Sequence, residues 1–467
     1  MNTSFFGEML QTITDRGRAF IDRTRARGRG TSAEHSQNLI DLCDALLSIR
    51  GEASGTALAR EVLVRYSELT IGPRIAFFEA LATRFGPDRE RIERAVEAWK
   101  QAPSDATAAE LHRSAEPRRQ ELFRRLNMAP GGTKALVAMR EQLMDALDHR
   151  DDLAAVDADF VHLFSSWFNR GFLVLRRIDW STPAVILEKI IQYEAVHEIS
   201  DWQDLRARID PPDRRCYAFF HPALVDEPLI FVEVALTREI ADAIPPILAP
   251  KREQVTPDRT TTAVFYSISN CQRGLAGVSF GSFLIKQVAA EISRELPRLS
   301  TFVTLSPAPG LAAWLKRERA SDSNKILTAD DRAALAALDA PDWLNDSATA
   351  EHLRDPLVRA AASYFLTART RTRAPIDPVA RFHLGNGARL ERINWLADPS
   401  PKGLQQSHGI MVNYLYDLND IEKNHEAYAK DRTVVASNAV TRLARAPAHD
   451  LAPLVESGAT ASLDIFL

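Results

Sequence analysis

The N-terminal third of the chain carries a helical pattern of apolar residues. From residue 7 to about 167, apolar positions recur at intervals of three and four, as in NLIDLCDALLSIR and RIAFFEALATRF. Short breaks such as GEASG and APGGT separate these runs, and hardly any run alternates with a period of two. The pattern predicts an all-helical domain, 1–167, of seven or eight helices that serves as scaffold and oligomer interface.

The pattern then changes to strands alternating with helices. The stretch AVILEKIIQYEAV predicts a helix. Ser181-Thr182-Pro183 precedes it and supplies an N-cap followed by a proline in the first turn. Three strand patterns follow, CYAFFHP, LIFVEVALT and TTAVFYSIS, and then a glycine-rich loop, the helix SFLIKQVAAEISREL and the strand TFVTL. Residues 214–306 therefore predict a mixed sheet with a β-loop-α-β crossover, within a second, α/β domain over 168–467.

Composition narrows the class of protein. A chain of 467 residues favours two domains, and 45% hydrophobic with 26% charged residues is typical of a soluble globular protein. Because 58 basic residues nearly balance 62 acidic ones, the chain has no strong positive electrostatic field that would indicate a nucleic-acid partner. Cys43, Cys216 and Cys271 are widely spaced, which argues against disulfides and zinc. We expect no metal and no membrane partner, and the lack of a signal pattern predicts a cytoplasmic protein.

The loop in SISNCQRGLAGVSFGSFLIKQ joins a predicted strand to a predicted helix. Its small residues and the helix N-terminus favour an anion site, although the spacing matches neither a P-loop nor GxGxxG. CQRGLA resembles the pyrophosphate loop of GNAT acyltransferases, with Cys271 where that pattern prefers Gln or Arg. A plain glycine-rich turn is the alternative. The candidate coenzyme A contacts are Gln272, Arg273, Gly274, Leu275, Ala276, Gly277 and Ser282.

Two polar residues stand at places that suit chemistry. Ser306 ends the strand LSTFVTL, whose alternation puts Thr304 and Ser306 on one face, and strand ends in α/β sheets are ligand positions. A capping serine is the alternative. His383 precedes LGNGA in a polar region, where it is either a satisfied core histidine or a catalyst. The strand pattern MVNYLYDL places Tyr414 and Tyr416 on one face. Both could be core residues, or one could donate a proton or bind a carboxylate.

Several stretches, taken together and in order, resemble the malonyl-CoA decarboxylase family. They are RRCYAFFHPAL, EPLIFVEVALT, FYSIS with GLAGVSFGSFLIKQV, LSPAPGLAAWL, FHLGNGARLERINWLAD and SHGIMVNYLY. The resemblance covers residues from about 155 to about 435, and it extends more loosely to the helical part through LLSIRGEASG and FFEALATRFG. Several motifs in one order are more specific than any one of them alone.

The resemblance implies a helical oligomerisation domain, assembling as a homodimer or homotetramer, before a GNAT-like catalytic domain. It implies a catalytic serine at Ser306 in LSPxPG and a catalytic histidine at His383 in HLxNGA. It also implies functional roles for Tyr416 in VNYxY and Ser267 in FYSIS. Ser279 stands where many members carry an acidic residue, so a role for that carboxylate is not carried over.

The implied reaction converts malonyl-CoA to acetyl-CoA and CO2, with coenzyme A as part of the substrate and no separate cofactor. Loss of CO2 leaves a thioester enolate, and a histidine of near-neutral pKa would protonate its carbon. We expect Ser306 to hydrogen-bond the acyl group, His383 to position it and protonate the enolate, and Tyr416 to be a second acyl contact. Pro307 lacks the N–H that a nucleophile elbow uses in its oxyanion hole.

Three other functions stay open at this point. An acyltransferase would share the phosphate loop but transfer the acyl group to an acceptor amine. A thioesterase would use Ser306 covalently and release malonate and free coenzyme A. A non-catalytic malonyl-CoA-binding protein would keep the loop without needing both Ser306 and His383.

Overall fold

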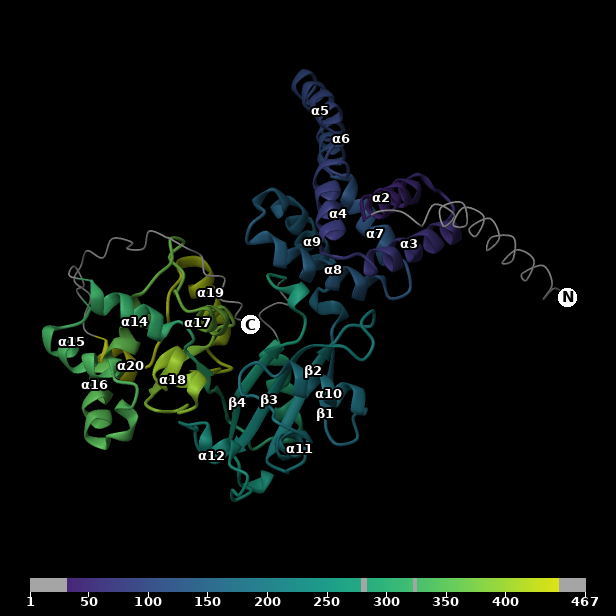
Figure 1. Ribbon diagram of the computed structural model, residues 1–467. Helices are drawn as coiled ribbons and strands as arrows, with labels where there is room; N and C mark the ends of the chain where they lie inside the picture. The colour runs from purple at the N-terminus through teal and green to yellow at the C-terminus, as the bar shows by residue number, and fades with distance from the viewer. Residues whose placement is uncertain (1–31, 279–283, 322–325, 445–467) are drawn as a thin grey trace. The chain divides into compact units, whose positions relative to one another are not determined.

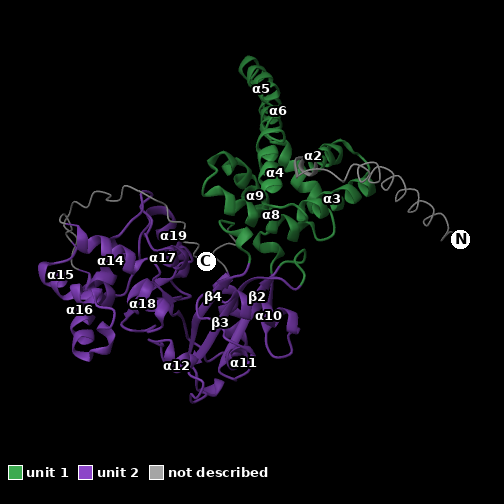
Figure 2. Cartoon of the chain, viewed as in Figure 1, with its two compact units in different colours: residues 1–173, 221–225, 272–279 green, residues 174–220, 226–271, 280–467 purple. Residues whose placement is uncertain are grey.

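The computed structural model describes residues 32–278, 284–321 and 326–444 (Figure 1). The chain divides into two compact units (Figure 2). Unit 1 comprises Met1–Leu173 with two short later segments, His221–Val225 and Gln272–Ser279. Unit 2 comprises the remainder of the chain. The boundary at 167/168 stays a prediction beside this contact-based division.

Unit 1 is mainly helical between residues 32 and 167, as the apolar spacing predicts. Rings from α7 and α9 meet in its core, where Phe123 and Phe160 stack with centroids 4.1 Å apart. Ser104 begins α6 with a capping box that it shares with Thr107. Between residues 32 and 167 the described helices are α2 Ser32–Ser48, α3 Glu52–Ser67, α4 Ile71–Thr83, α5 Arg89–Gln101, α6 Asp105–Ala115, α7 Arg118–Asn127, α8 Gly132–Leu147 and α9 Ala154–Trp167.

Unit 2 is built on a mixed eight-stranded sheet. The strand order is β1-β2-β3-β4-β5-β8-β6, and β7 pairs with β8 off this path. β4 and β5 pair in parallel, whereas the other neighbours pair antiparallel. The strands are β1 Val174–Ile178, β2 Arg214–Phe220, β3 Pro228–Thr237, β4 Thr262–Asn270, β5 Thr301–Thr304, β6 Ser306–Pro307, β7 Arg389–Asn394 and β8 Met411–Leu415.

Helices of unit 2 cover this sheet and its loops. α10 and α11 supply Ile186, Ile190 and Leu205 to one buried cluster with β2 and β3. A second cluster joins α12 to β4, β5 and β8. The helices are α10 Ala184–Tyr193, α11 Trp202–Ile209, α12 Pro245–Leu248, α13 Leu284–Glu295, α14 Leu311–Ala320, α15 Ala329–Leu335, α16 Ser347–Thr367, α17 Pro378–Gly385, α18 Pro401–Ser407, α19 Ile421–Asp431 and α20 Asn438–Leu443.

The helical region followed by a mixed α/β sheet confirms the predicted fold class, including the β4-α13-β5 crossover. The start of α10 differs from the prediction in detail. Pro183 is the N-cap rather than a first-turn residue, and no side chain caps the helix. Thr182 instead accepts the backbone N–H of Asp179, because a tight turn precedes the helix. Between α14 and α16, Leu335 and Trp343 are buried and belong to a folded part of unit 2.

Candidate active site

Ser306 lies where two strands of unit 2 converge on β8. The backbone N–H of Leu305 still bonds to Phe265 of β4, and one residue later Ser306 pairs with Val412 of β8. Pro307 pairs with Met411 without needing an N–H, because β6 is at the end of the strand order. Ser306 is buried, and its backbone pairs with β8.

His383 is presented by α17, a helix with a buried anchor at its start. Asp377 is the N-cap and accepts the N–H of Ala380 at 2.8 Å, while Pro378 occupies the first turn. The hydroxyl of Tyr364 donates to the other carboxylate oxygen of Asp377 at 3.0 Å. Burial raises the pKa of Asp377 to about 6. These contacts fix the helix whose last turn carries His383.

Ser306, His383 and Tyr416 form a continuous hydrogen-bonded line inside unit 2. Nε2 of His383 lies 3.0 Å from Oγ of Ser306, and Nδ1 lies 2.8 Å from the hydroxyl oxygen of Tyr416. The backbone of Tyr416, just past β8, is held by its N–H bond to Phe302 of β5. Three of the four residues given functional roles by the sequence are therefore brought together by β6, α17 and the end of β8.

The imidazole of His383 is enclosed. Its side chain is 1% exposed, and the ring of Tyr414 stacks on it with centroids 4.6 Å apart and planes 24° apart. Burial lowers the pKa of His383 to about 3. The expectation of a near-neutral pKa is therefore wrong for this structure: desolvation of the charged form outweighs the ordinary basicity of histidine, and the ring is neutral at pH 7.

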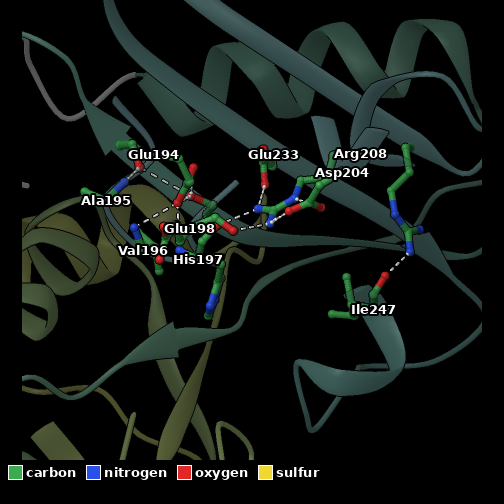
Figure 3. Close-up of polar contacts among 12 residues, drawn as sticks. Glu194, Ala195, Val196, His197, Glu198, Asp204, Arg208, Glu233 and Ile247 are labelled. Atoms are coloured by element: carbon green, nitrogen blue, oxygen red, sulfur yellow. Dashed lines mark hydrogen bonds and ion pairs between the residues drawn. The ribbon is translucent and has the colours of Figure 1, made fainter. Parts of the chain in front are cut away.

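Ser267 lies in a different polar cluster of unit 2. Its hydroxyl donates to the carboxylate of Glu194 at 2.7 and 2.8 Å. Among the described residues it shares no hydrogen bond with Ser306, His383 or Tyr416. Glu194 also accepts the N–H groups of Val196 and His197, each at 2.8 Å (Figure 3). The β4 serine thus anchors the turn that follows α10.

This Glu194 cluster concentrates buried charge. Arg208 donates to the carbonyl oxygens of His197 and Glu198 and to Glu233, as Figure 3 shows. Burial, with Glu194 nearby, raises the pKa of Glu233 to about 8, and burial also raises the pKa of Glu194. Sequence reasoning missed Glu194 because a single acid after an amphipathic helix looks like any solvated surface residue.

The candidate phosphate loop belongs to unit 1, where it packs on α8. A Cβ on Gly274 would lie 2.1 Å from the carbonyl oxygen of Val137. Arg140 of α8 donates to the carbonyls of Gly274 at 2.9 Å and Ala276 at 2.6 Å. The need for glycine at 274 thus has a packing cause. Gly277 differs, with φ of +76° and nothing within 4 Å of the Cβ position.

The other predicted loop residues are partly engaged in unit 1. Arg273 forms an ion pair with Asp145 of α8 at 2.5 Å. Gln272 is the N-cap residue of the 3₁₀ turn Arg273–Leu275, without a capping hydrogen bond from its side chain. The N–H groups of Leu275 and Ala276 donate to carbonyls inside the loop. Ser279 and Ser282 lie outside the described residues.

In the described ranges, no group of three or more His, Cys, Asp or Glu side chains is arranged to hold a metal ion. No helix among the described residues has the length and apolarity needed to cross a membrane.

Comparison with family models and curated relatives is consistent along the chain. Residues 171–453 match the malonyl-CoA decarboxylase C-terminal domain, and residues 85–168 match the N-terminal domain of the same family. The mitochondrial malonyl-CoA decarboxylase of the goose Anser anser anser is 36% identical over 412 residues, which cover 80% of this chain and 81% of that protein. The mouse (Mus musculus) enzyme is 34% identical over 395 residues, covering 78% of this chain and 80% of its own.

Solved structures agree with these matches. The malonyl-CoA decarboxylase of Rhodopseudomonas palustris is 59% identical with a TM-score of 0.85, over 87% of this chain and 99% of its own. That of Cupriavidus metallidurans is 37% identical with a TM-score of 0.69, over the same 87% and 99%. Because the family models and the relatives together account for most of the sequence, this chain belongs to the malonyl-CoA decarboxylase family.

Proposed function

We propose that the protein decarboxylates malonyl-CoA to acetyl-CoA and CO2 at the line formed by Ser306, His383 and Tyr416. The observation that carries the proposal is this hydrogen-bonded line, with distances of 3.0 and 2.8 Å, in a chain of the malonyl-CoA decarboxylase family. Curated relatives that share 34 to 36% identity bear the same enzyme name.

The reaction makes three demands on the protein. The breaking C–C bond must stand perpendicular to the thioester plane, negative charge on the thioester oxygen must be stabilised, and a proton must reach carbon. Orientation and a preorganised hydrogen-bond donor meet the first two demands. In the proposed mechanism, the Ser306 hydroxyl is the donor to the acyl group, and no covalent bond to serine forms.

The histidine works as a neutral group in this proposal. Because burial lowers the pKa of His383 to about 3, the ring keeps one N–H at pH 7 and carries no charge. A neutral imidazole can donate a hydrogen bond to Ser306. As the Ser306 proton passes to the enolate carbon, the Nε2 proton of His383 replaces it on the serine oxygen, and solvent water returns a proton to the ring. Tyr416 lies within hydrogen-bond distance of Nδ1 of this ring, so we assign it the positioning of the histidine. Its role as a second acyl contact stays a prediction.

Substrate binding completes the proposal. We assign the coenzyme A pyrophosphate to the loop 272–277 and the adjoining Ser282, on the strength of small residues and the expected helix N-terminus. No separate cofactor takes part, since the thioester itself delocalises the enolate charge. Dialysis against a chelator should leave the activity unchanged. Homo-oligomerisation and a cytoplasmic location belong to the same proposal, and light scattering and cell fractionation test them.

The decisive experiment follows products from malonyl-CoA with wild-type protein, Ser306→Ala and the control Ser300→Ala. Ser300 is exposed, so its removal leaves the site intact. We expect equal amounts of acetyl-CoA and CO2 from the wild type and the control, and a loss on the order of 100-fold in kcat/KM for Ser306→Ala. Malonate with free coenzyme A would indicate a thioesterase. Tight binding without turnover would indicate a binding protein, and full activity of Ser306→Ala would refute the site.

A further inference from the structure

One hydroxyl that the proposed mechanism does not use touches Ser306 directly. Thr304, the last residue of β5, lies on the same side of the chain as Ser306, and its side chain is fully buried. The hydroxyl of Ser306 donates to Oγ1 of Thr304 at 2.8 Å. The backbone N–H of Tyr414 on β8 donates to the same oxygen at 3.3 Å. Thr304 therefore accepts two hydrogen bonds beside the catalytic serine.

These donors give the line at the site a direction. A serine hydroxyl has a single proton, and here that proton points to Thr304. Oγ of Ser306 must then accept its bond from His383, which puts the ring proton on Nε2. A neutral imidazole with Nε2–H has its lone pair on Nδ1, and that lone pair accepts from the hydroxyl of Tyr416.

The backbone around Thr304 is held firmly enough to maintain this direction. Thr304 is in register with Phe265 across the parallel β4–β5 pair. Its carbonyl oxygen accepts from the side-chain amide of Asn413 at 2.9 Å, and that residue belongs to β8. The hydroxyl of Thr304 therefore faces Ser306 from a strand fixed on both sides.

We propose that Thr304 is a positioning residue for decarboxylation, which orients the Ser306 hydroxyl and selects the Nε2–H tautomer of His383. The proposal rests on the proposed function for its kinetic part. With His383 donating to it, Ser306 cannot pass its own proton to the histidine, so it stays a hydrogen-bond donor rather than a nucleophile. When the acyl group arrives, the Ser306 hydroxyl turns from Thr304 to the substrate by rotation about its Cβ–Oγ bond, while the bond from His383 is kept.

A purely structural role for Thr304 would give a different result in mutants. Thr304→Val keeps the β-branched shape but removes the acceptor, whereas Thr304→Ser keeps the acceptor and removes the methyl group. A packing role is therefore tested by the serine variant and an acceptor role by the valine variant. Thr304→Ala provides a second test of acceptor loss if the valine variant does not fold.

The experiment combines steady-state kinetics with the tautomer of His383. The tautomer is read from the ¹⁵N chemical shifts of labelled histidine, with the His383 signals identified by their loss in His383→Gln. We expect wild-type protein without substrate to show Nε2–H, and Thr304→Val to show a mixture with Nδ1–H. We also expect Thr304→Val to lose about 10-fold in kcat with KM changed less than about twofold, because molecules with Nδ1–H lack the hydrogen bond from His383 to Ser306. Thr304→Ser should stay within about twofold of wild type in both constants.

The outcomes separate this proposal from the proposed function. An Nδ1–H tautomer in the wild type would overturn the role of Thr304, whatever the variants do. A slower Thr304→Val with an unchanged tautomer would also overturn it, in favour of packing. If wild-type protein does not decarboxylate malonyl-CoA, the proposed function fails, yet the tautomer measured without substrate still decides whether Thr304 orients the line.

Discussion

The hydroxyl oxygen of Tyr416 lies 2.8 Å from Nδ1 of His383, across the imidazole from the nitrogen that faces Ser306. Tyr414 contacts the same ring in another way. It stacks on the face of the imidazole, and its hydroxyl has no hydrogen-bond partner among the residues that the structure describes. The two tyrosines of one strand pattern thus offer a matched pair of tests. One provides a hydrogen bond to the ring, and the other provides only its aromatic face.

Tyr416→Phe should lower kcat by about 10-fold with little change in KM, because it removes one hydrogen bond that orients His383. Tyr414→Phe keeps the stacking ring and should behave like wild type in steady-state assays with malonyl-CoA. Equal losses in both variants would contradict a hydrogen-bonding role for Tyr416 and indicate sensitivity to any change around the ring.

His383 should make the free energy of unfolding fall as the pH decreases below 6.5. Its folded-state pKa of about 3 lies below the ordinary value of 6.5, so the unfolded chain binds the proton first and stability is lost through that window. His383→Gln does not titrate, so the stability difference between wild type and variant should shrink by about 1 kcal/mol per pH unit. Urea unfolding at a series of pH values measures it.

Other buried groups titrate in both proteins and cancel in this comparison. Burial also lowers the pKa of His197 and His408, each to about 4. A constant difference between wild type and His383→Gln across the pH series would contradict a depressed pKa at His383. The same depression predicts that kcat/KM has no acid limb near 6.5 arising from this residue.

Two glycine variants should separate the packing requirement from the backbone requirement for glycine in the loop 272–277. Gly274→Ala places a methyl group against the Val137 carbonyl and should destabilise unit 1 by more than about 2 kcal/mol. Gly277→Ala has open space and carries only the cost of a positive φ, about 1 kcal/mol. Thermal unfolding measures both effects. Equal losses of stability would show that the contact with α8 does not set the need for glycine.

Ser267 and Glu194 should act as a coupled pair. Ser267→Ala leaves the half-buried Glu194 carboxylate without one of its donors, and we expect a loss of about 1 to 3 kcal/mol in the free energy of unfolding. In a double-mutant cycle with Glu194→Gln, the coupling energy should be on the order of 1 kcal/mol. Additive effects would show that the two side chains act independently. The exposed Ser300→Ala serves again as a neutral control.

Much of the fold could be predicted because its signals are local. The helical spacing before residue 168 and the strands around LIFVEVALT depend on which neighbours are apolar. The structure confirms the strands, and it confirms the helices from residue 32 onward. The alternation of LSTFVTLSP also put Thr304 and Ser306 on one face, as observed. The meeting of Ser306, His383 and Tyr416 was available only through the family resemblance, since 77 residues separate the first two.

The remainder could not be predicted because it depends on burial and long-range packing. The low pKa of His383 arises from the enclosure by Tyr414 and the surrounding core, which no local pattern reports. Likewise, the hydrogen bond between Ser267 and Glu194 joins residues 73 positions apart. Glycine is needed at position 274 because that residue packs against Val137 of α8, which lies far earlier in the chain.

The assignment of the loop 272–279 to unit 1 has a consequence for dividing the protein. Unit 1 is assembled from three separate segments of the chain, so no single cut, whether by a protease or by a cloning boundary, yields both units whole. A fragment that starts at residue 168 would carry the loop without Arg140, the residue that holds its carbonyls. The two units therefore cannot be expressed whole from two consecutive pieces of the gene. Exchanging the helical region between relatives would require the loop to be exchanged with it.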